Sequence, residues 1–353
     1  MSMPTDPSAA ATSTSASASA SVSASASASA SASASASASP ALLHPGRIAL
    51  WIGLAVLLAA PFIGLYPVFM MNALCFAIFA CAFNLLLGYT GLLSFGHAAY
   101  LGAAAYVTGW LVRSGGLTPE LGVLAGTGVA ALCGLGVGLI AIRRQGIYFA
   151  MITLAMAQMI YFVFLQAPFT GGEDGMQGVP RGKLFGLISL ANDRVLYYVV
   201  LAVFVAVFLF IIRIVHSPYG QVLKAIRENE PRAISLGYDV DRYKLLAFVL
   251  STALAGLAGS MKSLVLGFAT LSDAHWSLSG EVVLMTLLGG MGTFAGPVIG
   301  AFTIIGLQNF LADQVGSWIN VIIGVIFVVC VVAFRKGFVG ELLAWQQRRN
   351  KSG

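Results

Sequence analysis

The feature that most constrains this chain is a succession of apolar blocks, each long enough to cross a lipid bilayer as one helix. Crossing about 30 Å of hydrocarbon takes roughly 20 helical residues. From Arg47 onward such blocks follow one another, separated by short polar segments. The expected spans are Ile48–Tyr66, Val68–Leu87, Leu92–Val112, Leu121–Ile142, Ile147–Gln166, Val195–Val215, Leu245–Leu266 and Trp318–Phe334. The pattern predicts an all-α, polytopic transmembrane bundle of about 8–10 spans, since every backbone polar group in lipid must be satisfied internally.

The scarcity of charge excludes a soluble globule. Charged residues make up 9% of the chain and hydrophobic residues 58%, whereas soluble domains average about 25% charged residues. The apolar residues also come in blocks, not in the alternation of an outer-membrane barrel. The net charge is +6, but in a membrane protein the placement of basic residues matters more than their sum. We therefore expect a membrane-lipid environment and no nucleic-acid partner.

The cysteines and histidines give no sign of a metal centre or an enzyme. The four cysteines lie inside apolar runs, without a CxxC pair or a Cys/His cluster, and the four histidines are scattered. Small hydrophobes in helix packing explain these cysteines best. We predict no disulfide, no metal site and no catalytic set, which argues against a membrane-embedded enzyme.

The ends of the chain differ from its apolar centre. Alternating Ala and Ser residues fill most of 8–39, and such a sequence buries too little area to offset the ordering of the chain. We expect a disordered tail over 1–46, a transmembrane domain over 47–340 with a polar loop at 216–244, and a C-terminal tail over 341–353. The tail lacks the basic start and leucine-rich core of a signal peptide.

The segment Val282–Leu311 does not fit a simple span. It is too long for one upright helix and short for two, and Gly289–Pro297 forms a turn-rich break in its middle. We expect a re-entrant hairpin or two short helices, tolerable only where protein surrounds the break.

Basic residues orient the predicted spans. Arg47, the Arg143–Arg144 pair, the Ser217–Lys244 loop and the segment Arg335–Lys351 hold most of them. Alternating spans put these on one side, provided that Val282–Leu311 enters and leaves from the other side. Because Lys and Arg are retained inside, both termini are predicted to be cytoplasmic.

The polar loop Ser217–Lys244 reads SPYGQVLKAIRENEPRAISLGYDVDRYK. Gln221–Asn229 favours a helix, and Pro231 suits the first turn of a second one. Glu230 is the expected cap of that second helix and Gly237 its stop. The loop predicts a compact helical knob, while a solvated linker between two spans is the plain alternative.

Several motifs in this part of the chain resemble one family. Glu230, Ala233 and Gly237 after a span resemble the EAA loop of ABC importer permeases. Four further segments agree in order: Asn84–Tyr106, Gly146–Gln158, Thr170–Pro180 and Leu287–Ala301. Together with Leu245–Met261 they resemble the branched-chain amino acid permeases of the LivM/LivH type, and the LivM type more closely.

The resemblance implies a non-catalytic subunit of an ABC importer in a bacterial inner membrane. It implies a second, LivH-like permease subunit, two ABC ATPase subunits and an extracytoplasmic solute-binding protein. ATP and Mg²⁺ would be held by the ATPase subunits, because this chain has no phosphate-binding G-x-x-x-x-G-K-[ST] loop. Branched-chain amino acids are the default substrate, with other amino acids, urea or short amides as alternatives. The implied ATPase-coupling residues are Gly220, Arg227, Glu228, Glu230, Arg232, Ala233 and Gly237.

Other candidate residues concern the solute. Polar groups inside spans are costly and mark candidate pathways, and those that stand out are Asn84, Ser94, His97, Tyr148, Thr153 and Gln158. Interhelical hydrogen bonding is the competing explanation for each of them. On the predicted outer face, candidate contacts with the binding protein are Thr170, Gly171, Gly172, Glu173 and Asp174, although this stretch is equally consistent with a simple loop.

A stand-alone secondary transporter driven by an ion gradient is the alternative function. Such transporters often carry a carboxylate near the middle of the membrane. Asp273 and Glu281 lie at the edges of the predicted spans, which counts against this alternative.

Overall fold

The computed structural model describes residues 66–184, 186 and 188–315, with isolated residues at 53, 55–59, 61, 321–322, 324–325, 328 and 337. Two compact units comprise residues 1–58 and 59–353, and every element below belongs to the second. The predicted tails 1–46 and 341–353 lie outside the described residues, as do most of the predicted spans Ile48–Tyr66 and Trp318–Phe334.

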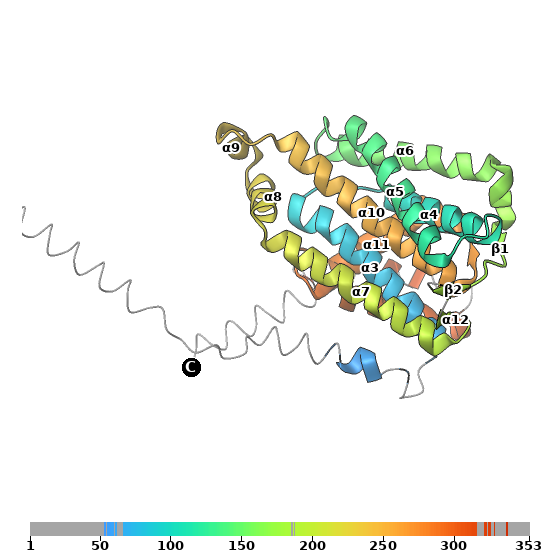
Figure 1. The fold of residues 1–353 in the computed structure, drawn as a ribbon. Helices are drawn as coiled ribbons and strands as arrows, with labels where there is room; N and C mark the ends of the chain where they lie inside the picture. The colour runs from blue at the N-terminus through green and yellow to red at the C-terminus, as the bar shows by residue number, and fades with distance from the viewer. Residues whose placement is uncertain are drawn as a thin grey trace, which may run out of the picture. The chain divides into compact units, whose positions relative to one another are not determined.

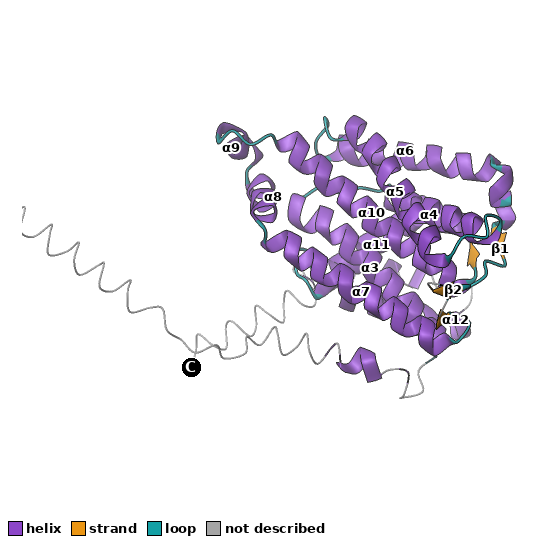
Figure 2. Ribbon diagram, viewed as in Figure 1, coloured by secondary structure: helices purple, strands orange, loops and turns teal. Residues whose placement is uncertain are grey.

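The described chain is a bundle of helices with four very short strands (Figures 1 and 2). The helices are α3 (Pro67–Thr90), α4 (His97–Arg113), α5 (Pro119–Ala141), α6 (Ile147–Gln166), η2 (Pro168–Thr170), η3 (Gly172–Asp174), α7 (Asp193–His216), α8 (Pro218–Glu228), α9 (Glu230–Ser235), α10 (Val240–Leu266), η4 (Leu271–Ala274), α11 (Trp276–Gly289) and α12 (Gly296–Val315). The strands are β1 (Met176–Gln177), β2 (Lys183–Leu184), β3 (Ile188–Ser189) and β4 (Phe268–Ala269).

Within the described ranges, five helices are long and apolar enough to cross a membrane, namely α3, α5, α6, α7 and α10. This confirms the prediction of a polytopic helical membrane protein. The predicted span Leu92–Val112 differs, because its helix begins only at His97. Gly91 ends α3 in a left-handed conformation (φ +76°), and the chain then runs without helix to His97. The glycines flanking this stretch therefore break the long apolar run into two helices.

The long helices run alternately between two ends of the bundle (Figure 1). Helices α8 and α9 lie at one end, which we call the α8–α9 end. The short strands lie at the other, which we call the sheet end. There β1 pairs antiparallel with β4, with Met176 opposite Ala269, and β2 pairs antiparallel with β3, with Lys183 opposite Ser189. The connections at the α8–α9 end are thus separated from those at the sheet end by the length of the helices.

Helices α11 and α12 form a hairpin that opens toward the sheet end. Glu281 in α11 accepts a hydrogen bond from Gln308 in α12, so the two helices run antiparallel. Gly289 and Gly300 permit this approach, since a Cβ at Gly300 would lie 2.8 Å from the carbonyl carbon of Met285. The connection at residues 290–295, which we call the hairpin tip, lies at the α8–α9 end. Both helices therefore enter from one end, as the sequence-based orientation required.

Helices α3 and α10 form the centre of the bundle. In the most apolar 18-residue stretch of each helix, 83% of the residues of α3 and 67% of those of α10 are buried. The corresponding share is 28% in both α5 and α6. Glycines let α10 approach its neighbours, because a Cβ at Gly259 would lie 2.7 Å from the carbonyl carbon of Leu101 in α4. Such close backbone approach is how membrane helices gain packing energy when hydrocarbon surrounds them. The apolar side chains of α5 and α6 that point outward suit contact with lipid or another subunit.

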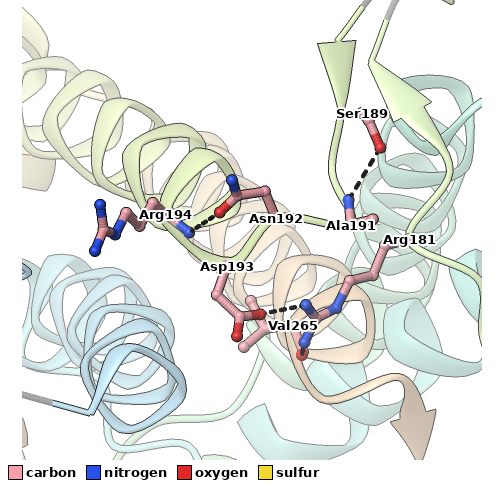
Figure 3. Close-up of polar contacts among 7 residues, drawn as sticks. All are labelled: Arg181, Ser189, Ala191, Asn192, Asp193, Arg194 and Val265. Carbon is pink, nitrogen blue, oxygen red and sulfur yellow. Dashed lines mark hydrogen bonds and ion pairs between the residues drawn. The ribbon is translucent and has the colours of Figure 1, made fainter.

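At the sheet end, Arg181 contacts both α7 and α10 (Figure 3). The Arg181 guanidinium pairs with the Asp193 carboxylate at the start of α7 and donates to the Val265 carbonyl oxygen near the end of α10, at 3.1 Å. Asn192 caps α7 by accepting a hydrogen bond from the Arg194 N–H at 3.0 Å. The loop before α7 is thereby held against two long helices.

A second ion pair lies deeper at the same end. The Lys262 ammonium of α10 is 2.5 Å from a carboxylate oxygen of Asp273 in η4, and the two side chains are 11% and 9% exposed. The ammonium also lies 4.9 Å from the centre of the Phe76 ring. Lys262 was not singled out from the sequence, because a single lysine near the end of an apolar span is common.

Candidate functional site

Helix α8 begins where α7 ends, at a serine–proline pair. The Ser217 hydroxyl accepts a hydrogen bond from the Gly220 N–H at 3.4 Å, and Pro218 occupies the first turn, where its missing N–H costs nothing. A Cβ at Gly220 would lie 2.5 Å from the carbonyl oxygens of Ile214 and Val215. Gly220, a candidate coupling residue, is therefore buried where the chain turns out of α7.

Helix α9 is started by an asparagine. The Asn229 side chain accepts a hydrogen bond from the Arg232 N–H at 3.1 Å. The expected cap, Glu230, is instead the first residue of the helix, with Pro231 in the first turn as predicted. Asparagine is among the best helix caps because its short side chain reaches the unpaired N–H groups of the first turn.

The same helix ends at Gly237, as the sequence predicts. Gly237 has φ +88°. Its N–H donates to the Ile234 carbonyl oxygen at 2.9 Å, and the Tyr238 N–H donates to the Ala233 carbonyl oxygen at 3.3 Å. This is the Schellman arrangement, in which a left-handed glycine lets the chain fold back over the last turn.

A charged contact braces α9 against the long helices. The Glu230 carboxylate accepts hydrogen bonds from Lys244 Nζ at 2.6 Å and from Gln145 Nε2 at 2.8 Å. The Lys244 side chain is only 4% exposed, and the Glu230 carboxylate is its partner in this ion pair. Glu230 thus joins the start of α9 to α10 and to the connection between α5 and α6.

A small apolar core completes the brace. Ile226, Ala233 and Val240 are buried together where α8, α9 and α10 meet. Beside them the Tyr219 ring stacks on the Tyr243 ring, with the ring centres 5.6 Å apart. The Tyr219 hydroxyl donates a hydrogen bond to the Tyr243 backbone carbonyl oxygen at 3.0 Å. Burial raises the pKa of Tyr219, so it stays an uncharged donor at neutral pH. Ala233 therefore serves internal packing.

Three large apolar side chains point away from this core. Ile234, Leu236 and Tyr238 are 57%, 68% and 41% exposed. We call them the docking face. They belong to a charged segment outside the predicted spans, where a lipid environment does not account for their exposure. Exposed apolar groups rimmed by polar residues are typical of a protein interaction surface. Two candidate coupling residues, Glu228 and Arg232, are exposed nearby.

Arg227 differs from the other charged residues of α8. The residue as a whole is exposed, but its guanidinium donates to the Gly88 carbonyl oxygen in the last turn of α3. A Cβ at Gly292, in the hairpin tip, would lie 3.3 Å from Arg227 Nη1. Arg227 is therefore directed toward the bundle.

The pathway candidates on α3, on α4 and in the stretch between these helices are buried and hydrogen-bonded. Asn84 binds the hairpin tip, and Ser94 accepts from the Gly96 N–H at 3.3 Å. The His97 Nε2 atom pairs with the Ser251 hydroxyl at 2.8 Å, and the ring lies edge-on to Phe83, Tyr100 and Phe248. The contacts of Asn84 and His97 fit the interhelical alternative, the Ser94 contact is local, and a role of these residues in the pathway stays a prediction.

The candidates on α6 lie on different faces of that helix. Thr153 is buried, donates to the Ala150 carbonyl oxygen at 2.9 Å, and lies against Gly96, where a Cβ would be 2.6 Å from the Thr153 carbonyl oxygen. Tyr148 is 67% exposed and Gln158 is half-buried. The fold brings Thr153 close to the turn before α4 and leaves Tyr148 at the surface.

The candidate binding-protein contacts lie at the sheet end. The Thr170 hydroxyl is buried and donates to the Phe164 carbonyl oxygen at 2.6 Å. Gly171 and Gly172 have φ +78° and +61° and form the turn into η3. Glu173 and Asp174 are exposed in η3. Of these candidates the two carboxylates are available to a partner, and the other three shape the loop.

A comparison of the sequence with models of protein families gives one match over most of the described residues. A family model described as the branched-chain amino acid transport system permease component covers residues 65–331, which is more than half of the chain. The chain belongs to this permease family.

Named permeases share the same region. The chain is 29% identical to the high-affinity branched-chain amino acid transport system permease protein LivM of Escherichia coli over 266 residues, which is 67% of this chain and 61% of LivM. It is 26% identical to the ribose import permease protein RbsC of Bacillus subtilis over 250 residues, covering 66% of this chain and 73% of RbsC. It is 26% identical to the fructose import permease protein FrcC of Rhizobium meliloti over 231 residues, covering 61% and 62%. No solved structure matches the chain.

Two features of this family member escaped sequence reasoning. The docking face was not singled out from the sequence, because the exposure of Ile234, Leu236 and Tyr238 depends on how α9 packs against α8 and α10. The apolar positions alternating around Gly237 were the available signal. The link from Arg227 to the hairpin tip was missed because these residues lie far apart in sequence.

Proposed function

We propose that this chain is the membrane-embedded permease subunit of an ATP-driven importer in a bacterial inner membrane. Its cargo would be branched-chain or other amino acids, or related small amides. The observation that carries the proposal is the exposed docking face on a braced helical segment outside the apolar spans. Family membership supports it, because LivM, RbsC and FrcC are named as permeases.

In this proposal the α8–α9 end faces the cytoplasm and binds an ATPase subunit. Leu236, 68% exposed, would enter an apolar groove of that subunit, with Glu228 and Arg232 at the rim. Gly220 and Ala233 support the segment from inside, and Glu230 fixes it to α10. Closure of two ATPase subunits on ATP would then move the segment as one body.

The sheet end would face the binding protein. Glu173 and Asp174 are exposed there and suit a partner with basic residues. The outward apolar faces of α5 and α6 leave room for lipid and for a second, LivH-like permease subunit. Solute would cross within the assembly, which this chain forms with its partners.

Replacing Leu236 by aspartate tests the docking face. A carboxylate in an apolar groove loses its hydration, so we expect at least about a tenfold loss of ATPase-subunit binding. Copurification of the ATPase subunits with the permease from detergent measures this. Leu117→Asp is the matched control, since Leu117 is an exposed leucine at the sheet end. Equal retention of ATPase subunits by both variants would contradict the proposed docking.

One observation favours the alternative of a secondary transporter. Lys262 and Asp273 form a buried ion pair at the sheet end of the bundle, and buried ionisable groups in transmembrane proteins often serve ion-coupled transport. Uptake into proteoliposomes separates the two functions. The proposal expects uptake only when ATPase subunits, binding protein and ATP are present. Uptake by the chain alone under a proton or sodium gradient would establish the alternative.

The cargo is best identified through the binding protein that accompanies this permease. Thermal-shift screening of that protein with amino acids, small amides and sugars measures which ligands it binds. We expect leucine, isoleucine or valine to give the largest stabilisation, because this chain is 29% identical to LivM and 26% identical to RbsC. Stabilisation by ribose or fructose alone would redirect the proposal to sugars.

A further inference from the structure

The hairpin tip is fastened to the end of α3 by one asparagine. Asn84 Oδ1 accepts a hydrogen bond from the Gly292 N–H at 2.9 Å, and Asn84 Nδ2 donates to the Thr293 carbonyl oxygen at 2.9 Å. The side-chain amide thus pairs with two backbone groups of the tip. Because both groups of the amide are used, Asn84 fixes both the position and the orientation of the tip.

Aromatic contacts hold the same tip from two other elements. The Phe294 ring stacks on His216, the last residue of α7, with ring centres 5.4 Å apart. It also lies 6.0 Å from Tyr89 in α3. The tip therefore contacts α3 and the point where α7 passes into α8.

Arg227 completes this junction from α8. Its guanidinium donates to the Gly88 carbonyl oxygen, one of the carbonyls that a helix end leaves without a partner in the helix. Its stem passes Gly91, where a Cβ would lie 3.3 Å from Arg227 Cγ. Gly292 faces the same guanidinium, since its Cβ would lie 3.3 Å from both Arg227 Nη1 and the Gly88 carbonyl oxygen. Glycines with positive φ at 91 and 292 thus leave the space that the arginine occupies.

We infer that Arg227 is the positioning residue through which displacement of the α8–α9 segment reaches the α11–α12 hairpin. The inference rests on the proposed function, in which ATPase subunits move that segment. Arg227 stands on α8, which is braced to α9 and α10 through Ile226 and Tyr219. It contacts the end of α3, to which Asn84 fastens the tip. A shift of α8 consequently pulls on α3 and the hairpin together.

The contact is suited to transmission because it joins the rigid guanidinium of α8 directly to the backbone of α3. Arginine offers several N–H donors in a rigid planar group, and its positive charge is favoured at the negative end of α3. A lysine in its place keeps the charge but loses the fixed geometry. We therefore expect uptake per ATP to be highest with arginine at position 227, lower with lysine and lowest with alanine.

The test uses the whole importer, with its second permease subunit, ATPase subunits and binding protein, reconstituted in proteoliposomes. Variants are Arg227→Ala, Arg227→Lys and Asn84→Asp, which keeps the acceptor for Gly292 but removes the donor to Thr293. Lys224→Ala is the matched control, because Lys224 lies one turn earlier in α8 and is half-exposed. Copurification, ATP hydrolysis and uptake are measured on each complex.

The expected result is uncoupling. Arg227→Ala and Asn84→Asp should keep the ATPase subunits and hydrolyse ATP at close to the unaltered rate, while uptake per ATP falls roughly tenfold. Arg227→Lys should fall between, and Lys224→Ala should match the unaltered complex. Unchanged uptake per ATP in Arg227→Ala would overturn the inference. Failure of both Arg227 variants to insert and assemble would also overturn it, in favour of a purely structural role.

A distance measurement reports the movement itself. Spin labels at Met291→Cys in the tip and Met151→Cys in α6, both exposed positions, are introduced after the native cysteines are replaced. In the unaltered complex their separation should change on addition of ATP and vanadate, and in Arg227→Ala this change should be lost. An identical change in both would contradict the inference. Failure of the proposed function would give a different result. In that case even the unaltered permease would neither bind ATPase subunits nor change its label separation on addition of ATP.

Discussion

At the scale of single residues, polar side chains inside this bundle are used to join helices. Asn84, His97 and Ser251 each reach a partner on another element, as expected where an unpaired polar group costs free energy in a low-dielectric interior. Glu230 follows the same rule at the α8–α9 end, with two donors around its carboxylate. Substitutions at such positions are predicted to act first on helix-to-helix geometry.

Glu230 provides the clearest case. Glu230→Lys would face Lys244, whose side chain is 4% exposed, and removing one partner of a buried pair costs about 3 kcal/mol. We expect α9 to detach from α10 while the membrane helices stay folded. Faster amide hydrogen exchange over residues 229–238, with unchanged exchange in α3, measures this. Glu230→Gln, which keeps an oxygen acceptor, should show a smaller effect, and slow exchange in Glu230→Lys would contradict the brace.

At the scale of elements, glycine decides which helices touch. α10 meets α4 at Gly259 and α5 at Gly256, where a Cβ would approach Leu101 and Ala130. In contrast, a Cβ at Gly128 or Gly136 of α5 would have no atom within 4 Å. The glycines inside these helices thus fall into two groups. Those of the first group are needed for close packing between helices, and those of the second lie on an open face of their helix.

The two groups predict different responses to substitution. Gly259→Val forces α10 away from a backbone carbonyl that cannot rotate aside, and overpacking of this kind costs about 1–3 kcal/mol or more. We expect a lower unfolding temperature in detergent, measured by size-exclusion chromatography after heating. Gly136→Val is the control and should unfold near the temperature of the unaltered protein. Equal losses in both variants would mean that α10 and α4 do not pack as described.

At the scale of the whole molecule, alternating helix directions separate two sets of connections. The braced α8–α9 segment and the hairpin tip share one end, while the short sheets, η3 and the Arg181 contacts share the other. Two partners are thereby able to bind the same permease without competing. This separation is consistent with the proposed place of the subunit between an ATPase subunit and a binding protein.

Labelling from the two sides of the membrane tests this arrangement. With the native cysteines replaced, Glu173→Cys and Arg232→Cys should react with a membrane-impermeant maleimide from opposite sides. Because basic residues cluster at the α8–α9 end, we expect Arg232→Cys to react from the cytoplasm. Reaction of both from one side would show that the helices between them do not alternate as described.

The sequence by itself determined the class of this protein and most of its helices. Long apolar runs leave a chain in lipid little choice but helix, so α5, α6, α7 and α10 begin and end within a few residues of the predicted spans. Local signals also worked at Pro231 and Gly237, because caps and left-handed turns depend on neighbouring residues.

Only the tertiary structure decided what the singled-out residues touch. Arg227 meets Gly88, and Asn84 meets the hairpin tip, through contacts between residues more than a hundred positions apart in the chain. Neither composition nor periodicity carries such information, since both describe one helix at a time. Helix packing set by small residues brings these groups together, and it also turned Glu230 from an expected cap into a brace for Lys244.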